Sequence, residues 1–266
     1  MSETTPRITA PELTAMKSSG RKICMLTAYD YTMARLLDEA GVDGLLVGDS
    51  LAMVVQGRST TLSVTMDQLI YHAEMVGRAA RRALTVVDLP FPIPHQGPQE
   101  SLRAASRILK ETACQAVKLE GGAEQAEVIS VLASAGIPVM AHVGLRPQSV
   151  HQLGGYKVQR DEEILLADAL AAEQAGAFAV LLECIPAPIA EKITAALQTP
   201  TIGIGAGVGC DGQILVTHDI LGIESGYTPK FVKQYAQLPQ QISQAAQEYC
   251  QEVRDQVFPD KAHSFR

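Results

Sequence analysis

Five short apolar segments of this sequence each lead into a residue whose side chain can take part in chemistry. The five residues that close these segments are Asp49, Asp88, Glu120, His142 and Glu183. Each segment has the length and composition of a strand that is buried on both faces. In a parallel sheet or barrel the carboxyl ends of all strands lie on one face. We therefore expect these five side chains to converge on a single pocket.

The connections between these segments follow a repeating strand–helix pattern. Three predicted helices end in Ala-Gly and are followed at once by an apolar strand, at residues 40–42, 135–137 and 175–177. A glycine that ends a helix just before a strand is typical of a βα repeat. The pattern predicts eight strands and favours an α/β fold of the closed (β/α)8 TIM-barrel type. An open doubly wound sheet is the alternative, because periodicity alone does not show closure.

Capping residues predict where several helices begin. Thr9 is expected to cap a short helix that runs to about Lys17. Thr65 and Gln68 form a capping box at the start of a helix that runs to about Arg82. Further elements are expected as a first strand at 23–28, a helix at 99–114, a seventh strand from Pro200 and an eighth strand at 214–216.

The chain length of 266 residues fits one barrel domain. Residues 1–20 are expected to form an N-terminal extension with a short helix, and residues 239–266 a C-terminal helix and tail. The apolar residues of that helix are predicted to form one stripe, made of Ile242, Ala246, Tyr249, Val253 and Val257. Such a stripe needs a partner surface, which is either the flank of the barrel or another subunit.

The overall composition excludes several classes of function. A net charge of −7 provides no basic patch for nucleic acid, and no apolar run approaches membrane-spanning length. The first twenty residues lack a signal-peptide core, so we expect a cytoplasmic protein that acts on small molecules. The five cysteines form no C-x-x-C pair and suit neither a zinc site nor a disulfide framework.

Asp49 and Asp88 end different strands and have no basic residue beside them in the sequence. Two carboxylates brought close together repel one another, so they require a proton or a cation. Ligation by oxygen alone, with positions left for water and substrate, suits Mg²⁺. We therefore favour a metal site here. The alternative is that each aspartate only caps the helix that follows it.

The remaining polar residues at the strand ends allow functional and structural interpretations. Lys118 and Glu120 lie two apart on one strand and so point to the same side, either as part of the site or as a self-contained ion pair. His142 is a candidate site residue or a hydrogen-bonded structural imidazole. Glu183 is a candidate general base or a salt-bridged residue at the rim. The glycine-rich segment 203–207 lacks the G-x-G-x-x-G spacing, so we reject a nucleotide-binding assignment.

The motifs around these residues closely resemble those of the ketopantoate hydroxymethyltransferase family. The matching segments are Thr27–Asp30, Val47–Ser50, Asp88–Phe91, Val117–Gly122, His142–Leu145, Gly154–Gln159, Leu182–Pro186, Gly203–Gly207, Asp211–Val216, Pro229–Phe231 and His263–Phe265. They occur in the order of the family and cover nearly the whole chain from Thr27. The sequence differs from the family pattern after Phe91, where relatives carry a Ser-Tyr pair, and after Gln159, where the loop is shorter.

The resemblance implies a barrel of the phosphoenolpyruvate/pyruvate superfamily. It implies transfer of a hydroxymethyl group from 5,10-methylenetetrahydrofolate, the co-substrate, to 3-methyl-2-oxobutanoate (α-ketoisovalerate), which gives ketopantoate for pantothenate biosynthesis. By similarity, Mg²⁺ would be held by Asp49, Asp88 and Glu120, with Glu120 acting directly or through water. The keto acid would contact Asp49, Ser50, Asp88 and Lys118, with His142 beside it. Glu183 would be the catalytic base, and the chain would assemble as a homodecamer.

Two other functions remain open at the level of sequence. The same superfamily contains lyases and mutases that use a metal-stabilised enolate, but none of the five cysteines lies in a lyase cysteine motif. A non-catalytic ligand-binding barrel could also keep this scaffold. Its hallmark would be the loss of Asp49, Asp88 or Glu183, and all three residues are present.

Overall fold

The computed structural model describes residues 6–223 and 228–265. The chain divides into two compact units, Met1–Val216 and Thr217–Arg266. The first unit contains a barrel and the second contains a long helix. The expectation that residues 1–266 form a single domain stays a prediction, and residues 1–5 of the expected N-terminal extension lie outside the described part.

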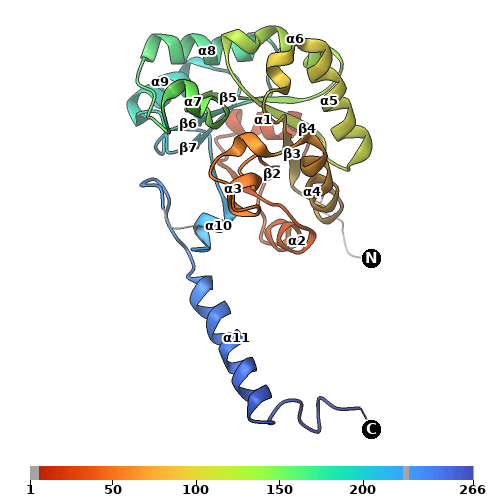
Figure 1. Ribbon diagram of the computed structural model, residues 1–266. Coiled ribbons are helices and arrows are strands. Elements are labelled where there is room, and N and C mark those ends of the chain that lie inside the picture. Colours follow the sequence, from red (N-terminus) through yellow and green to blue (C-terminus); the bar gives the residue numbers. More distant parts are fainter. Residues whose placement is uncertain (1–5, 224–227, 266) are drawn as a thin grey trace. The chain divides into compact units, whose positions relative to one another are not determined.

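Within the described residues, eight parallel strands pair in chain order and close into a barrel (Figure 1). The strands are β1 (Ile23–Thr27), β2 (Gly44–Val47), β3 (Leu84–Asp88), β4 (Ala116–Glu120), β5 (Val139–Gly144), β6 (Ala179–Glu183), β7 (Thr201–Ile204) and β8 (Gly212–Leu215). The pairing of β1 with β8 completes the ring. The predicted closed barrel is therefore confirmed, and the open sheet is excluded.

A ring of helices surrounds the strands (Figure 1). Its members are α2 (Tyr31–Glu39), α4 (Met66–Ala79), α5 (Pro98–Glu111), α6 (Ala126–Ser134), α8 (Glu162–Gln174) and α9 (Ala187–Ala196). Shorter helical segments lie between them: α3 (Leu51–Val54), η1 (Thr61–Ser63), η2 (Ile93–Gln96), η3 (Ala123–Gln125), η4 (Pro147–Ser149) and α7 (Val150–Leu153).

The capping box of Thr65 and Gln68 is confirmed, but the helix that it opens ends earlier than predicted. The helix stops at Ala79 instead of Arg82. The backbone N–H groups of residues 81–83 donate to the carboxylate of Asp38. Those amides therefore have a side-chain acceptor that competes with another helical turn. The helix predicted at 99–114 likewise ends early, at Glu111.

The pleat of the strands separates two hydrophobic clusters. Residues such as Val86, Ala116 and Met140 face the barrel interior, whereas Val117 and Leu119 pack in the larger cluster that includes the surrounding helices. Successive strand residues point to opposite faces. The same alternation therefore directs the side chains of the polar residues at the ends of β3 to β6 into the interior.

Helix α1 (Ala10–Ser18) packs against the interior cluster of the barrel. Its predicted capping box, formed by Thr9 and Glu12, is confirmed. Leu13 and Met16 are buried in the same cluster as Ile23, which begins β1. Full burial of a side chain of this size contributes about 1.5–3 kcal/mol. The N-terminal extension thus closes the amino end of the barrel and leaves the carboxyl end for chemistry.

The second unit contains α10 (Thr217–Ile220) and α11 (Leu238–Arg254). The predicted apolar stripe of α11 is present at Ile242, Tyr249 and Val253, which are exposed. Val257 was predicted to belong to this stripe, but the helix ends before it, at Arg254. In the part of the chain that is described, no helix combines the length and apolarity needed to cross a membrane.

Candidate active site

The barrel brings the predicted site residues together on neighbouring strands. Asp88 on β3 is in register with Lys118 on β4, and Glu120 on β4 is in register with His142 on β5. The register continues from Gly144 on β5 to Glu183 on β6. Asp88, Lys118, Glu120 and His142 are all buried. The fold therefore brings these side chains together, as predicted.

The structure corrects one premise about Asp88. The sequence shows no basic residue beside it, but Lys118 Nζ lies 2.7 Å from Asp88 Oδ1, and both side chains are buried. Burial on its own would lower the pKa of Lys118, but Asp88, Asp49 and Glu120 outweigh it and raise the pKa above its ordinary value. Lys118 is therefore a buried cation. It pairs across strands with Asp88, so the alternative of a self-contained pair with Glu120 is wrong.

Asp49 and Asp88 are joined by a hydrogen bond. The backbone N–H of Asp49 donates to Asp88 Oδ2 at 2.9 Å. Burial raises the pKa of Asp88 to about 7, the charge of Asp49 adds to this rise, and Lys118 opposes it. Asp49 does not cap the helix that follows it, which was the alternative to a metal site, because the N-cap of α3 is Ser50 and that cap has no side-chain hydrogen bond. The two aspartates are thus held side by side where β2 and β3 end.

The carboxylate of Glu120 is only half satisfied. Its Oε2 accepts a hydrogen bond from the backbone N–H of Gln148 at 3.0 Å. Its Oε1 has no hydrogen-bond partner among the described residues. Burial, followed by the charge of Asp49, raises the pKa of Glu120 well above its ordinary value. A buried acceptor without a donor is costly, and a cation or a bound ligand would relieve that cost.

These carboxylates fit a magnesium ion that keeps several exchangeable ligands. The described residues contain no group of three His, Cys, Asp or Glu side chains that could by itself hold a metal ion. Mg²⁺ is commonly bound through one or two carboxylates, while waters and substrate oxygens fill its other positions. Asp49 and Asp88, with the unpartnered oxygen of Glu120 nearby, supply such a donor set.

His142 lies between the lysine and the candidate base. Its Nε2 is 3.2 Å from Glu183 Oε2, and its Nδ1 is 3.3 Å from Lys118 Nζ. Burial and the charge of Lys118 lower the pKa of His142, and Glu183 opposes them. The imidazole, which these shifts keep neutral, therefore lies between Lys118 and Glu183. The side chain of Glu183 keeps 15% of its exposure, so it can meet a ligand that enters the barrel mouth.

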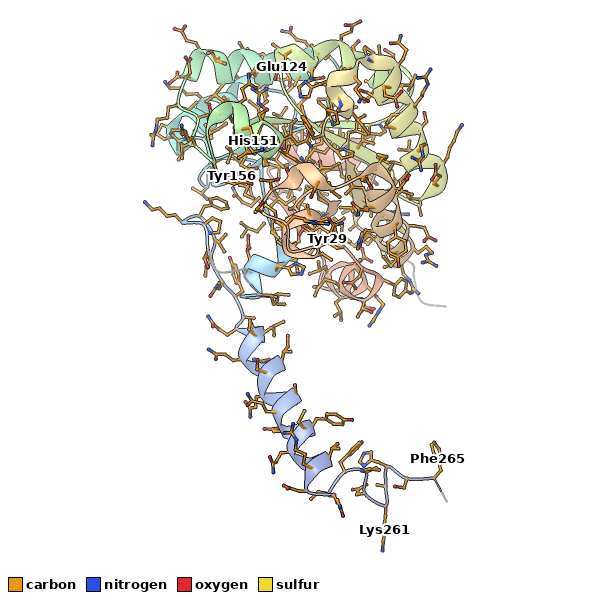
Figure 2. The ribbon with its side chains drawn as sticks, in the orientation of Figure 1. Tyr29, Glu124, His151, Tyr156, Lys261 and Phe265 are labelled. Carbon is orange, nitrogen blue, oxygen red and sulfur yellow. The ribbon has the colours of Figure 1, made fainter. Side chains whose placement is uncertain are left out.

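Ser50 has a partner that the sequence did not single out as a site residue. The phenol oxygen of the buried Tyr29 lies 2.7 Å from Ser50 Oγ. Tyr156, on the loop after α7, lies near the same end, where burial and the charges of Asp49 and Glu183 raise its pKa. Figure 2 labels both tyrosines. Tyr29 is the second residue after β1, which ends at Thr27. Its position just beyond a strand end is the sequence feature that could have identified it as a site residue.

Gln148 is the second residue that the sequence analysis missed. It lies in η4, after β5, and its side chain is buried. The side-chain Nε2 donates to Asp49 Oδ2 at 2.9 Å and to the backbone oxygen of Leu89 at 3.1 Å. No sequence pattern predicts such contacts for a glutamine in an irregular loop. Only the closed fold brings residue 148 to residue 49.

The glycine-rich segment 203–207 begins within β7 and continues into the following loop. Gly205 and Gly207 have positive φ angles of 63° and 83°. A Cβ atom at Gly207 would lie 2.5 Å from the Cβ of Ala187, so only glycine fits there. These glycines serve a tight turn and close packing, and the rejection of a nucleotide-binding role stays a prediction.

Comparisons with known proteins agree with this arrangement. The family model described as ketopantoate hydroxymethyltransferase matches residues 7–261. A 3-methyl-2-oxobutanoate hydroxymethyltransferase from Rhodopirellula baltica is 61% identical over 259 residues, which cover 97% of this chain and 96% of the relative. A protein of the same name from Desulforapulum autotrophicum is 54% identical over 261 residues, which cover 98% of this chain and 99% of the relative.

Among solved structures, the fold is similar to that of a phosphoenolpyruvate phosphomutase from Streptomyces platensis subsp. rosaceus. The TM-score is 0.64 at 17% sequence identity, and the match covers 93% of this chain and 88% of the other. At that identity the likeness concerns the fold alone. It agrees with the closed barrel described above.

Proposed function

The chain belongs to the ketopantoate hydroxymethyltransferase family, and from this premise we propose how its barrel carries out the family's reaction. The enzyme transfers a hydroxymethyl group from 5,10-methylenetetrahydrofolate to 3-methyl-2-oxobutanoate. One water is consumed, and the products are 2-dehydropantoate and tetrahydrofolate. One observation carries the proposal: the acids, the lysine and the imidazole lie together at the carboxyl ends of β3 to β6, where Asp88 is in register with Lys118 and Glu120 with His142.

Three residues are proposed to hold the metal and others the keto acid. Asp49 and Asp88 would bind Mg²⁺ directly and Glu120 through a water molecule, and the bound ion would polarise the keto oxygen and stabilise negative charge that develops there. Lys118 is a buried cation and can bind the carboxylate of the substrate. Ser50, whose hydroxyl is held by Tyr29, would add a hydrogen bond to the same substrate.

Glu183 is proposed to take the proton from C3 of the keto acid. Its side chain is partly exposed at the mouth and lies 3.2 Å from His142 Nε2. The consumed water breaks both C–N bonds of the folate methylene group, so that this carbon is released as formaldehyde and tetrahydrofolate leaves. The electron pair of the broken C–H bond then forms the new C–C bond to that carbon, and its oxygen takes up the proton held by Glu183 to become the hydroxyl group. Because the imidazole of His142 is held neutral by burial, it orients Glu183 without competing for the proton.

The proposal is tested by product formation. The purified protein, 3-methyl-2-oxobutanoate and 5,10-methylenetetrahydrofolate should yield 2-dehydropantoate, and a chelator should abolish the reaction until Mg²⁺ is restored. Cleavage of a keto acid without transfer would instead favour a lyase or mutase. Binding of the keto acid with no turnover would favour a ligand-binding barrel. Full activity in metal-free protein would contradict the metal requirement.

We also propose that the chain assembles as a homodecamer through the exposed apolar stripe of α11. Ile242, Tyr249 and Val253 are each more than two-fifths exposed. Burial of such a stripe between subunits would remove apolar surface from water. A chain truncated after Pro239 should give a smaller particle by light scattering. An unchanged number of subunits per particle would show that α11 is not needed for assembly.

A further inference from the structure

We propose that Gln148 is a positioning residue, which holds Asp49 and Glu120 in the orientation needed to bind the metal ion. This inference rests on the proposed function of the site. Gln148 contacts one carboxylate with its side chain and the other with its backbone. Its side-chain Nε2 donates to Asp49 Oδ2 at 2.9 Å, and its backbone N–H donates to Glu120 Oε2 at 3.0 Å. One residue thus fixes one oxygen of each acid.

The orientation of the Gln148 amide is determined by its neighbours. The Nε2 group faces two acceptors, Asp49 Oδ2 and the backbone oxygen of Leu89. Only the NH₂ end of an amide can donate to both, so the carbonyl end cannot take this place. The donor is also uncharged, so it fixes Asp49 without adding a second cation beside Lys118.

The other end of the Gln148 amide is buried without a partner. No described residue donates a hydrogen bond to its Oε1. Glu120 Oε1 is likewise a buried acceptor that has no hydrogen-bond donor in the described part of the chain. Buried acceptors are normally satisfied, and exceptions occur where a ligand or water completes the site. Gln148 and Glu120 thus each present one buried acceptor that a bound group or water would satisfy.

The loop that carries Gln148 is held firmly in place. The backbone N–H of Leu145 donates to the carbonyl oxygen of Glu183 at 2.9 Å, and Arg146 forms an ion pair with Glu124. Gly144 turns the chain with a φ angle of 102°, and a Cβ atom there would lie 2.3 Å from Glu183 O. The loop is therefore anchored to β6, and Gln148 is presented to the acids by a fixed backbone.

A glutamine-to-methionine exchange separates positioning from folding. Gln148→Met keeps the length of the side chain and removes its donor, while the backbone bond to Glu120 remains. Loss of a group that orients a metal ligand typically weakens metal affinity about 10–100-fold. We expect Gln148→Met to weaken Mn²⁺ binding by that factor, measured by electron paramagnetic resonance on the substrate-free protein. The KM for Mg²⁺ should rise similarly, while kcat at saturating Mg²⁺ changes less.

Gln115→Met is the matched control. Gln115 precedes β4 at the opposite end of the barrel, and its Oε1 accepts hydrogen bonds from the backbone N–H and the hydroxyl of Thr85. The control should lose thermal stability and keep its Mn²⁺ affinity. Equal Mn²⁺ affinity in Gln148→Met and the wild type would overturn the positioning role. Equal weakening in both variants would overturn it as well, since the cause would then be general destabilisation of the barrel.

A second variant covers the case in which Gln148→Met does not fold. Gln148→Asn keeps the amide but shortens its reach, so it too should bind Mn²⁺ more weakly than the wild type. Unchanged affinity in this variant would contradict the proposal. The wild-type protein tests the proposed function independently of these variants. If the wild type bound no Mn²⁺ and formed no 2-dehydropantoate, the proposed function itself would be wrong.

Discussion

Buried acids at the two ends of the barrel differ in how fully their oxygens are hydrogen-bonded. At the amino end, Asp43 accepts hydrogen bonds from Arg21, Arg82 and the backbone N–H of Cys24. At the carboxyl end, Glu120 Oε1 is buried and accepts no hydrogen bond from the described residues, although His142 Nδ1 lies 3.9 Å from it. The acids at the amino end are satisfied within the chain itself. At the carboxyl end Asp88 pairs with Lys118, whereas Glu120 accepts a hydrogen bond at one oxygen only.

This difference indicates which end is built for stability and which for chemistry. Paired and hydrogen-bonded acids stabilise the fold, whereas unsatisfied ones reduce its stability and are retained where they act. Asp211 follows the rule of the amino end, because it pairs with Lys17 at 2.9 Å and accepts from the backbone N–H of Thr201. Mutations at the two ends should therefore affect different measurements.

The largest expected effect is on activity, at the carboxyl end. Glu183→Gln keeps the size of the side chain and removes its basicity. Without folate, the wild type should exchange the C3 proton of 3-methyl-2-oxobutanoate with D₂O, followed by NMR. We expect the variant to slow this exchange by about 10²–10⁴-fold, the usual contribution of a general base. The melting temperature should stay close to that of the wild type. Exchange at the wild-type rate would show that another group is the base.

The next effect is on stability, at the amino end. Asp43→Ala removes the carboxylate that Arg21 and Arg82 share. Loss of one partner of a buried ion pair costs about 3–5 kcal/mol, and we expect the lower value because both arginines can reach water. Urea unfolding measures the loss. Activity per folded molecule should be unchanged. A large fall in kcat would contradict the view that the amino end serves stability and the carboxyl end serves catalysis.

The smallest expected effect is a gain in stability on adding Mg²⁺. A ligand at 100 times its Kd stabilises the folded state by about 2.7 kcal/mol. Wild-type protein should therefore melt at a higher temperature with Mg²⁺ than with a chelator. Asp88→Asn should lose this shift and bind the keto acid more weakly, whereas Asp43→Ala should retain the shift. If Asp88→Asn kept the full shift, Asp88 would not be needed for metal binding.

The sequence predicted the barrel and the grouping of the polar residues for the same reason. Each βα repeat places one strand end on the same face, so the pocket follows once the repeats are counted. The pairing of Lys118 with Asp88 could not be predicted, because the register between strands depends on the closed ring. The contact of Gln148 with Asp49 depends on loop geometry and not on periodicity. The early end of α4 depends on Asp38, which comes from another helix.

Strand β4 also constrains how this protein can change over evolutionary time. Lys118 and Glu120 face the barrel mouth, and Leu119 between them packs among the helices. Because the pleat has a period of two, a one-residue insertion or deletion before Lys118 would exchange these roles and bury two charges in the apolar shell. Substitutions that retune the site can therefore accumulate at alternate positions, but changes of length in the strand cannot. New chemistry on this scaffold has to arise by exchange of side chains or by growth of the loops.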